Sequence, residues 1–122
     1  MKIAITATGS SLDAEVDPRF GRCQYFIIVD PETMQFEALE NSAAMAGGGA
    51  GVSAAQTIAS KGVEAVLTGN CGPRAFATLS AGKVKVYTAV RGTVRDVVEK
   101  FKAGELQPAG EASVDAHFGS GL

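Results

Sequence analysis

Apolar positions in the first forty residues fall into three short segments, each bounded by polar or turn-forming residues. Residues 2–7 are mostly apolar and lead into Thr8-Gly9-Ser10-Ser11, which predicts a short strand followed by a loop. Residues 24–30 are rich in aromatic and β-branched side chains, and residues 34–40 alternate imperfectly between apolar and polar. A turn that begins at Asp30-Pro31 joins these two segments, so the pattern predicts a β-hairpin.

The spacing of apolar residues becomes helical after residue 51. A helix is predicted from there to Gly62, another from Pro73 to Gly82, and a third after Thr93, which suits an N-cap. Residues 64–68 and 84–89 lie between these helices and predict two further strands. The third helix has the clearest apolar face, formed at i, i+3, i+4 and i+7 by Val94, Val97, Val98 and Phe101.

The order β-β-β-α-β-α-β-α predicts an α/β fold with a mixed five-stranded sheet flanked by three helices. The alternation of strand and helix in the second half favours parallel strands with right-handed crossovers. If the first strand is central, with the hairpin on one side, then the first, third, fourth and fifth strands run the same way. The loops after these four strands then meet at one edge of the sheet, where open α/β folds usually bind ligands. These loops are residues 8–22, 41–51, 69–72 and 90–92.

Length and composition limit the domain organisation and the classes of partner. The chain has 122 residues, of which 46% are hydrophobic, as expected for one domain with a single core. We expect residues 1–104 to form this domain and residues 105–122, which lack periodicity, to form a flexible C-terminal tail. The formal net charge is −2, from 11 basic and 13 acidic side chains, so there is no electrostatic reason to expect a nucleic-acid partner.

The cysteine count and the N-terminal segment bear on the compartment. Two cysteines do not make a disulfide framework, and the N-terminus becomes polar too early for a secretory signal. No apolar run reaches the length that spans a bilayer. We therefore expect a cytoplasmic protein with reduced thiols and no membrane partner.

A glycine-rich run precedes the first predicted helix. Consecutive glycines there let backbone N–H groups face an anion at the positive end of the helix dipole, although a flexible connecting loop has the same composition. The run fits a dinucleotide fingerprint only loosely and has no Gly-Lys-Ser/Thr, so we expect no nucleotide. The glycines are Gly47, Gly48, Gly49 and Gly51.

Both cysteines fall at the predicted ligand-binding edge. Cys71 lies at a strand–helix junction, where helix N–H groups favour the thiolate, so it could serve as a soft-metal ligand or a nucleophile, or it could simply be a small residue that fills a tight turn. Cys23 closes the loop before the second strand, and it could also be a small buried residue. Two converging thiolates would form a site for Cu(I), iron or a metal–sulfur cluster. Arg19, Arg22 and Arg91 are predicted to converge on the same edge, and Arg74 could join them.

Other polar residues are weaker candidates for chemistry. Asp13, Glu15 and Asp17 would share one face of an extended segment and could hold a hard cation, but a solvated loop is the favoured interpretation. His117, the single histidine, could be a soft ligand on the tail or have no role. The first strand carries no carboxylate, so a two-metal nuclease is unsupported.

The order of several short motifs over residues 1–104 resembles the dinitrogenase iron–molybdenum cofactor-binding family, which includes nitrogenase accessory proteins X and Y and the orange protein. The family often has Ser-Glu-His before Phe-Gly-Arg, where this chain has Asp17-Pro18-Arg19. The motifs that carry the resemblance are Lys2-Ile3-Ala4-Ile5, Arg19-Phe20-Gly21-Arg22, Tyr25-Phe26, Glu40-Asn41, the glycines at 47–51, Gly62-Val63, Gly69-x-x-Gly72-Pro73-x-Ala75, Val84-Lys85-Val86-Tyr87 and Gly92-Thr93-Val94.

The resemblance implies a ribonuclease-H-like fold and a non-catalytic accessory protein. Such a protein would bind and deliver a metal–sulfur cluster, or its precursor, containing molybdenum with iron or copper, and would meet a cluster-donor or cluster-acceptor protein. Two other functions stay open: a regulatory domain that binds a partner without metal, and a thiol-dependent enzyme using Cys71. The candidate cluster-binding residues are Arg19, Arg22, Gly47, Gly48, Gly49, Gly51, Gly72, Arg74 and Arg91, and the candidate metal ligands are Cys71, Cys23 and His117.

Overall fold

Five strands form one mixed sheet in a computed structural model that describes residues 1–42 and 50–110. The strands are β1 (Ile3–Ala7), β2 (Tyr25–Val29), β3 (Phe36–Glu40), β4 (Ala65–Leu67) and β5 (Lys85–Tyr87), in the spatial order β3-β2-β1-β4-β5. β1 pairs antiparallel with β2 and parallel with β4, so the predicted central position of the first strand is confirmed.

The register places the ends of four strands at one edge of the sheet. On β1, Ile5 lies opposite Ile27 of the antiparallel β2 and Leu67 of the parallel β4. β2 pairs antiparallel with β3, and β4 pairs parallel with β5, so β1, β3, β4 and β5 all run the same way. We call the edge at which these four strands end the carboxyl edge. The predicted meeting of loops at this edge is therefore confirmed for the 8–22, 69–72 and 90–92 loops, and most of the 41–51 loop lies outside the described residues.

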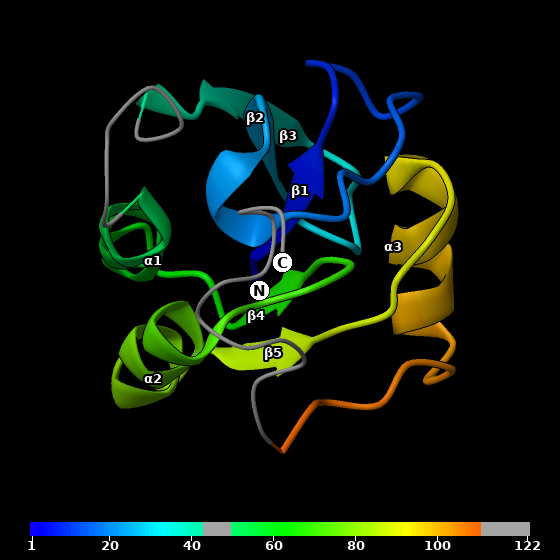
Figure 1. Cartoon of the computed structure of the whole chain (residues 1–122). Coiled ribbons are helices and arrows are strands. Elements are labelled where there is room, and N and C mark those ends of the chain that lie inside the picture. The colour runs from blue at the N-terminus through cyan, green and yellow to red at the C-terminus, as the bar shows by residue number, and fades with distance from the viewer. Residues whose placement is uncertain (43–49, 111–122) are drawn as a thin grey trace.

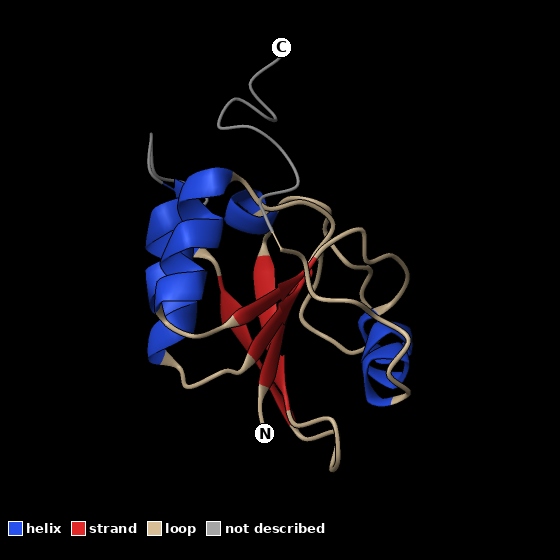
Figure 2. Ribbon diagram, turned by 90° about the horizontal axis from the view of Figure 1, so that it is seen from below, coloured by secondary structure: helices blue, strands red, loops and turns tan. Residues whose placement is uncertain are grey.

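Helices cover both faces of the sheet (Figures 1 and 2). α1 (Ala50–Ser60) and α2 (Pro73–Ala81) lie side by side on one face, and α3 (Val94–Lys102) lies on the other. Pro73 occupies the first turn of α2, and Thr93 caps α3 by accepting a hydrogen bond from the Asp96 N–H, as predicted. A short 3-10 helix, η1 (Phe20–Arg22), precedes β2.

The core consists of two layers, one on each side of the sheet, because neighbouring strand residues point to opposite faces. Toward α1 and α2 the strands present small or aromatic residues as well as aliphatic ones, and toward α3 they present mainly branched aliphatic ones. All five residues of β1 are buried, as expected for a strand covered on both faces. The strand residues on the α1 and α2 side are Ala4, Phe26, Ile28, Val66 and Val86, and those on the α3 side include Ile3, Ile5, Ile27, Val29, Ala65 and Leu67.

The segment that follows α3 returns along the sheet. Gly104 takes a φ of +74°, which ends the helix. Leu106 then packs against the core layer beneath α3, and the Ala109 N–H donates to the Val86 carbonyl at 2.7 Å. Residues 105–110 of the predicted tail are thus attached to β5, and residues 111–122 lie outside the described part of the chain.

None of the helices in residues 1–42 and 50–110 has the length and apolar character that crossing a bilayer would require. The mixed five-stranded sheet with three helices confirms the predicted α/β class. The finer assignment to the ribonuclease-H-like class, which came from the resemblance, stays a prediction.

The Thr93 cap can be tested by its removal. Thr93→Ala deletes the oxygen that accepts from the Asp96 N–H at 3.2 Å, so we expect a loss of about 1 kcal/mol in the free energy of unfolding measured in urea. Thr57→Ala is the matched control, because the Thr57 hydroxyl lies within α1 and bonds the Ser53 carbonyl. Equal stability of the two variants would contradict the capping role.

Candidate functional site

The loop between β1 and β2 (residues 8–22) crosses the carboxyl edge and is bonded to the neighbouring strands. The Asp17 N–H donates to the Thr6 carbonyl at 2.9 Å, which fastens the loop to the end of β1. Two further bonds reach the loop after β4: Asn70 N–H to the Pro18 carbonyl at 2.7 Å, and Phe20 N–H to the Asn70 carbonyl at 3.2 Å. Residues 18–20 therefore run beside residues 69–70, so the 8–22 and 69–72 loops meet at this edge, as the topology predicted.

Two glycines allow this loop to approach its neighbours closely. A Cβ on Gly69 would lie 2.6 Å from the Cα of Pro18, and a Cβ on Gly21 would lie 2.7 Å from the Cα of Gly51. Only hydrogen can occupy these positions without a shift of backbone. Because Gly51 is in the first turn of α1, the Gly21 contact joins η1 directly to the beginning of that helix.

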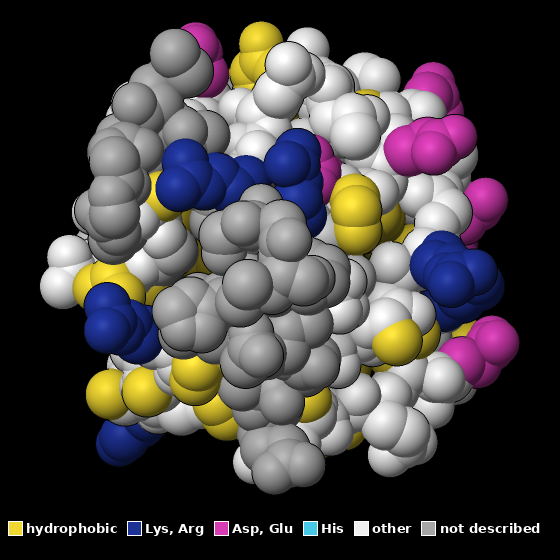
Figure 3. All heavy atoms as spheres, viewed as in Figure 1, with side chains coloured by type: hydrophobic (Ala, Val, Ile, Leu, Met, Phe, Trp, Pro, Cys, Tyr) yellow, Lys and Arg dark blue, Asp and Glu magenta, His cyan; other side chains and the backbone are white. Residues whose placement is uncertain are grey.

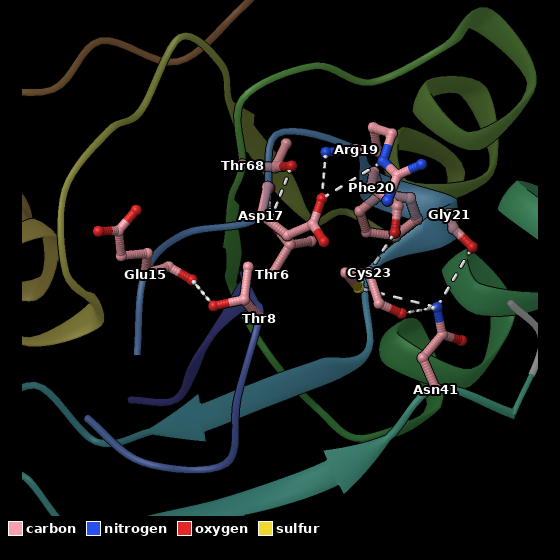
Figure 4. Close-up of polar contacts among 10 residues, drawn as sticks. All are labelled: Thr6, Thr8, Glu15, Asp17, Arg19, Phe20, Gly21, Cys23, Asn41 and Thr68. Carbon is pink, nitrogen blue, oxygen red and sulfur yellow. Dashed lines mark hydrogen bonds and ion pairs between the residues drawn. The ribbon is translucent and has the colours of Figure 1, made fainter. Parts of the chain in front are cut away.

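Buried polar side chains connect β1, β4 and the loop at the same point. Thr6 and Thr68 are fully buried and share a hydrogen bond of 2.9 Å, and the Thr6 hydroxyl also lies 2.7 Å from the Asp17 carbonyl (Figure 4). Asp17 is 5% exposed, and its Oδ1 accepts the Arg19 N–H at 2.9 Å. In the described residues every buried side-chain nitrogen or oxygen has a hydrogen-bond partner, so this polar cluster is fully satisfied.

The position of Asp17 differs from what the sequence predicted for the three acidic residues of this loop. The acidic residues at 13, 15 and 17 were expected either to share one face for a cation or to lie in a solvated loop. Asp13 and Glu15 are exposed, and Asp13 pairs with Arg95 of α3 at 3.3 Å. Asp17 instead lies beneath the loop, and its Oδ1 is 3.7 Å from the Arg19 Nε. A single sequence gives no signal that separates this aspartate from its two neighbours.

The predicted arginines lie on exposed positions of the loops and helix that meet at the carboxyl edge. Arg19 and Arg22 are exposed on either end of η1, and Figure 3 shows Lys and Arg side chains gathered over that segment. Arg74 is exposed in the first turn of α2, and Ala75 beside it lies close to Gly51. Arg91 belongs to the β5–α3 loop, where the Gly92 carbonyl accepts from the Val16 N–H at 2.9 Å.

α1 and α2 begin at the carboxyl edge without neutralising groups of their own. Neither helix has an acidic residue in its first turn, and Gly72 gives α2 no side-chain cap. By contrast, α3 has both the Thr93 cap and Asp96 in its first turn. The N–H groups and dipole at the start of α2 therefore remain available to an anion that approaches this edge.

The two cysteines were candidates for accessible thiolates that could bind a metal, but both are buried. Cys23 is fully buried and Cys71 is 1% exposed, and both belong to the core layer beneath α1 and α2. Burial raises the pKa of Cys71 to about 12; burial, with a smaller contribution from the Asp17 charge, raises the pKa of Cys23 to about 12. The expected lowering of the Cys71 pKa by helix N–H groups is therefore wrong: desolvation of the thiolate dominates.

Asn41 is a positioning residue that sequence analysis missed. Its Nδ2 donates to the carbonyls of Cys23 at 2.9 Å and Gly21 at 3.2 Å and lies 3.7 Å from the Cys23 Sγ. Asn41 directly follows β3, so it holds η1 against the hairpin (Figure 4). The Glu40-Asn41 motif was part of the family pattern, but the partners of the amide are backbone groups and leave no trace in the sequence.

Several predicted site residues cannot be placed. Gly47, Gly48, Gly49 and His117 lie outside the described residues. Within residues 1–42 and 50–110, no group of three or more His, Cys, Asp and Glu side chains is arranged to hold a metal ion. The carboxyl edge as described offers arginines and backbone N–H groups, with thiols beneath them.

Comparison with known proteins identifies the class of protein that this fold and edge define. The model of the family described as dinitrogenase iron-molybdenum cofactor matches residues 1–104, so the chain belongs to this family. The resemblance drawn from the motifs is thereby confirmed.

Individual relatives agree with the family assignment. The apo form of the orange protein from Desulfovibrio gigas is 42% identical, with a TM-score of 0.89, over 93% of this chain and 96% of that one. A NifB-like protein of the DUF35 family from Thermotoga is 41% identical, with a TM-score of 0.76, over 88% and 91%. An uncharacterised protein of Methanocaldococcus jannaschii is 33% identical over 110 residues, which cover 88% of this chain and 90% of that protein.

The close approach at Gly21 predicts a large effect of one methyl group. Gly21→Ala places a Cβ within 2.9 Å of two backbone atoms of Gly51, so we expect a loss of about 1–3 kcal/mol in the free energy of unfolding in urea. Gly110→Ala is the control, because a Cβ there meets nothing within 4 Å. A Gly21→Ala variant as stable as Gly110→Ala would refute the packing of η1 on α1.

The raised thiol pKa values predict low reactivity in the folded protein. At pH 8 both cysteines should react with iodoacetamide far more slowly in the native protein than in urea, as measured by mass spectrometry. Because folding favours the protonated thiols, their contribution to stability is complete below pH 9 and declines as pH rises toward 12. Rapid native alkylation of Cys71 near neutral pH would contradict this and would favour a thiol enzyme.

Proposed function

We propose that this protein binds and delivers a metal–sulfur cluster, or its precursor, containing molybdenum with iron or copper, as a non-catalytic accessory protein. The cluster is the cargo of the protein. The observation that carries the proposal is the convergence of arginine-bearing loops and the uncapped N-terminus of α2 at the carboxyl edge of a chain that belongs to the iron-molybdenum cofactor family.

The chemistry of the edge suits an anionic, sulfide-rich cargo. Such clusters carry several negative charges on polarizable sulfur, and arginine and backbone N–H groups bind anions by charge-assisted hydrogen bonds. Arg19 precedes η1, Arg22 is its last residue, and the first turn of α2 adds Arg74 and its backbone N–H groups. Gly72 at the start of α2 and Gly51 at the start of α1 let the backbone come close to a bound group. We include Arg91 and the glycines at 47–49 in the same proposed surface.

Direct coordination by cysteine is a separate step in this proposal. Cys71 and Cys23 are buried as neutral thiols, so ligation would require that a proton leaves and that η1 or the 69–72 loop moves to expose the sulfur. Initial capture by arginines and N–H groups needs no such movement. We therefore propose capture first, with Cys71, Cys23 or His117 as later metal ligands.

A carrier also needs a donor and an acceptor. We propose that a cluster-donor or cluster-acceptor protein meets the carboxyl edge in the cytoplasm, where thiols stay reduced. Before any metal–protein bond forms, cargo held by hydrogen bonds and charge can be released simply by dissociation, which suits delivery. The orange protein and the NifB-like protein resemble this chain along most of its length and support such a role.

Anaerobic reconstitution tests the proposal. The purified protein is mixed with tetrathiomolybdate and copper, or with iron and sulfide, and uptake is read from visible absorption and metal analysis after gel filtration. We expect a stoichiometric coloured complex, and we expect Arg19→Ala to weaken it roughly tenfold through loss of a charge-assisted hydrogen bond. Arg95→Ala is the matched control, since Arg95 lies on α3 and pairs with Asp13 of the 8–22 loop.

The outcomes separate the parts of the proposal. No uptake from either mixture would refute cluster binding. An equal loss of cluster affinity in Arg19→Ala and Arg95→Ala would refute a site at η1. It would indicate that the cluster is attracted by positive charge at any position on the surface. Cys71→Ser should leave initial capture unchanged and reduce retention of the metals if Cys71 becomes a ligand, so unchanged retention would remove Cys71 from the set of ligands.

A further inference from the structure

Asp17 is the best-anchored charged side chain at the carboxyl edge. Its backbone N–H donates to the Thr6 carbonyl at 2.9 Å, and its own carbonyl lies 2.7 Å from the Thr6 hydroxyl. Thr6 is fixed in turn by its 2.9 Å bond to Thr68, which directly follows β4. The side chain of Asp17 is only 7% exposed, although the residue belongs to a surface loop. A carboxylate held this firmly can orient a partner that moves more freely.

That partner is Arg19, whose side chain is 53% exposed. The Asp17 Oδ1 accepts the Arg19 backbone N–H at 2.9 Å and lies 3.7 Å from the Arg19 Nε. Figure 4 shows both contacts, from one Asp17 oxygen to the Arg19 backbone nitrogen and to its Nε. The aspartate therefore occupies one edge of the guanidinium and leaves the other edge for a second anion.

We propose that Asp17 is a positioning residue that directs the Arg19 guanidinium toward the cargo bound at the carboxyl edge. The inference rests on the proposed function and extends it to a residue beneath the binding surface. Asp17 does not touch the cargo. Its charge attracts the Nε side of Arg19 at 3.7 Å, which favours one orientation of the guanidinium before the anion arrives, so less side-chain freedom is lost on binding.

The sign of the effect separates positioning from simple electrostatics. Asp17 is negatively charged and lies near a site for an anion, so on charge alone Asp17→Asn should tighten binding. Positioning predicts the opposite, because an amide holds the Nε edge less firmly than a carboxylate. The amide oxygen that Asp17→Asn introduces can still accept the Arg19 backbone N–H, so the substitution alters the charge pair and preserves the turn.

The experiment compares Asp17→Asn with Asp13→Asn in the full chain. Asp13 offers the same chemical change, since its Oδ1 also pairs with an arginine Nε, but it lies on the α3 side. Titration with the preformed tetrathiomolybdate–copper cluster should give about threefold weaker binding for Asp17→Asn and no loss for Asp13→Asn. In a protein that already carries Arg19→Ala, Asp17→Asn should cause no further loss of affinity for the cluster. The Arg19 Nε–Hε NMR signal of the cluster-free protein should shift and broaden in Asp17→Asn.

Each outcome has one meaning. Binding that is unchanged or tighter in Asp17→Asn would overturn the positioning role, and so would an equal further loss in the Arg19→Ala background, which would indicate a general structural defect. A substantial loss of thermal stability in Asp17→Asn, with an unaltered Arg19 signal, would also overturn it. If the unchanged protein takes up no cluster, the proposed function fails, and the Arg19 signal still decides whether Asp17 orients this side chain.

Discussion

The structure depends on backbone-to-backbone contact between the 8–22 loop and two other segments, the loop that follows β4 and the first turn of α1. At Gly21 and Gly69 the chains approach so closely that a Cβ would overlap neighbouring backbone. These contacts convert a long surface loop into a fixed bridge across the carboxyl edge. The backbone that carries Arg19 and Arg22 is thereby held beside the first turn of α1 and the loop that follows β4.

Burial divides the carboxyl edge into two chemical layers. Arginines and the N–H groups of α2 face outward, whereas the thiols of Cys23 and Cys71 lie in the core layer beneath them and remain protonated. Asp17 lies between the layers, where its charge disfavours the Cys23 thiolate and pairs with Arg19. The outer layer is suited to recognising charge, and the inner layer becomes reactive only if the loop opens.

Sequence reasoning succeeded where one physical signal dominates. Apolar periodicity, the Thr93 cap and Pro73 located the helices, and the βα alternation placed the first strand at the centre of the sheet. It failed for Cys71, because proximity to a helix N-terminus and burial shift a thiol pKa in opposite directions. Burial of Cys71 is nearly complete only because segments distant in the sequence pack around it. Sequence reasoning also overlooked Asn41, whose partners are backbone groups.

The sequence by itself determined the α/β class, the central place of the first strand and the family, because each depends on patterns that repeat along the chain or on motifs in fixed order. The tertiary structure decided which polar residues are buried, which backbone segments touch and which charge faces which. Asp13 and Asp17 have the same side chain and lie close together in the sequence, yet one is exposed and the other is enclosed. That difference arises from contacts between residues far apart in sequence, such as Thr6, Asp17 and Thr68, which no local pattern encodes.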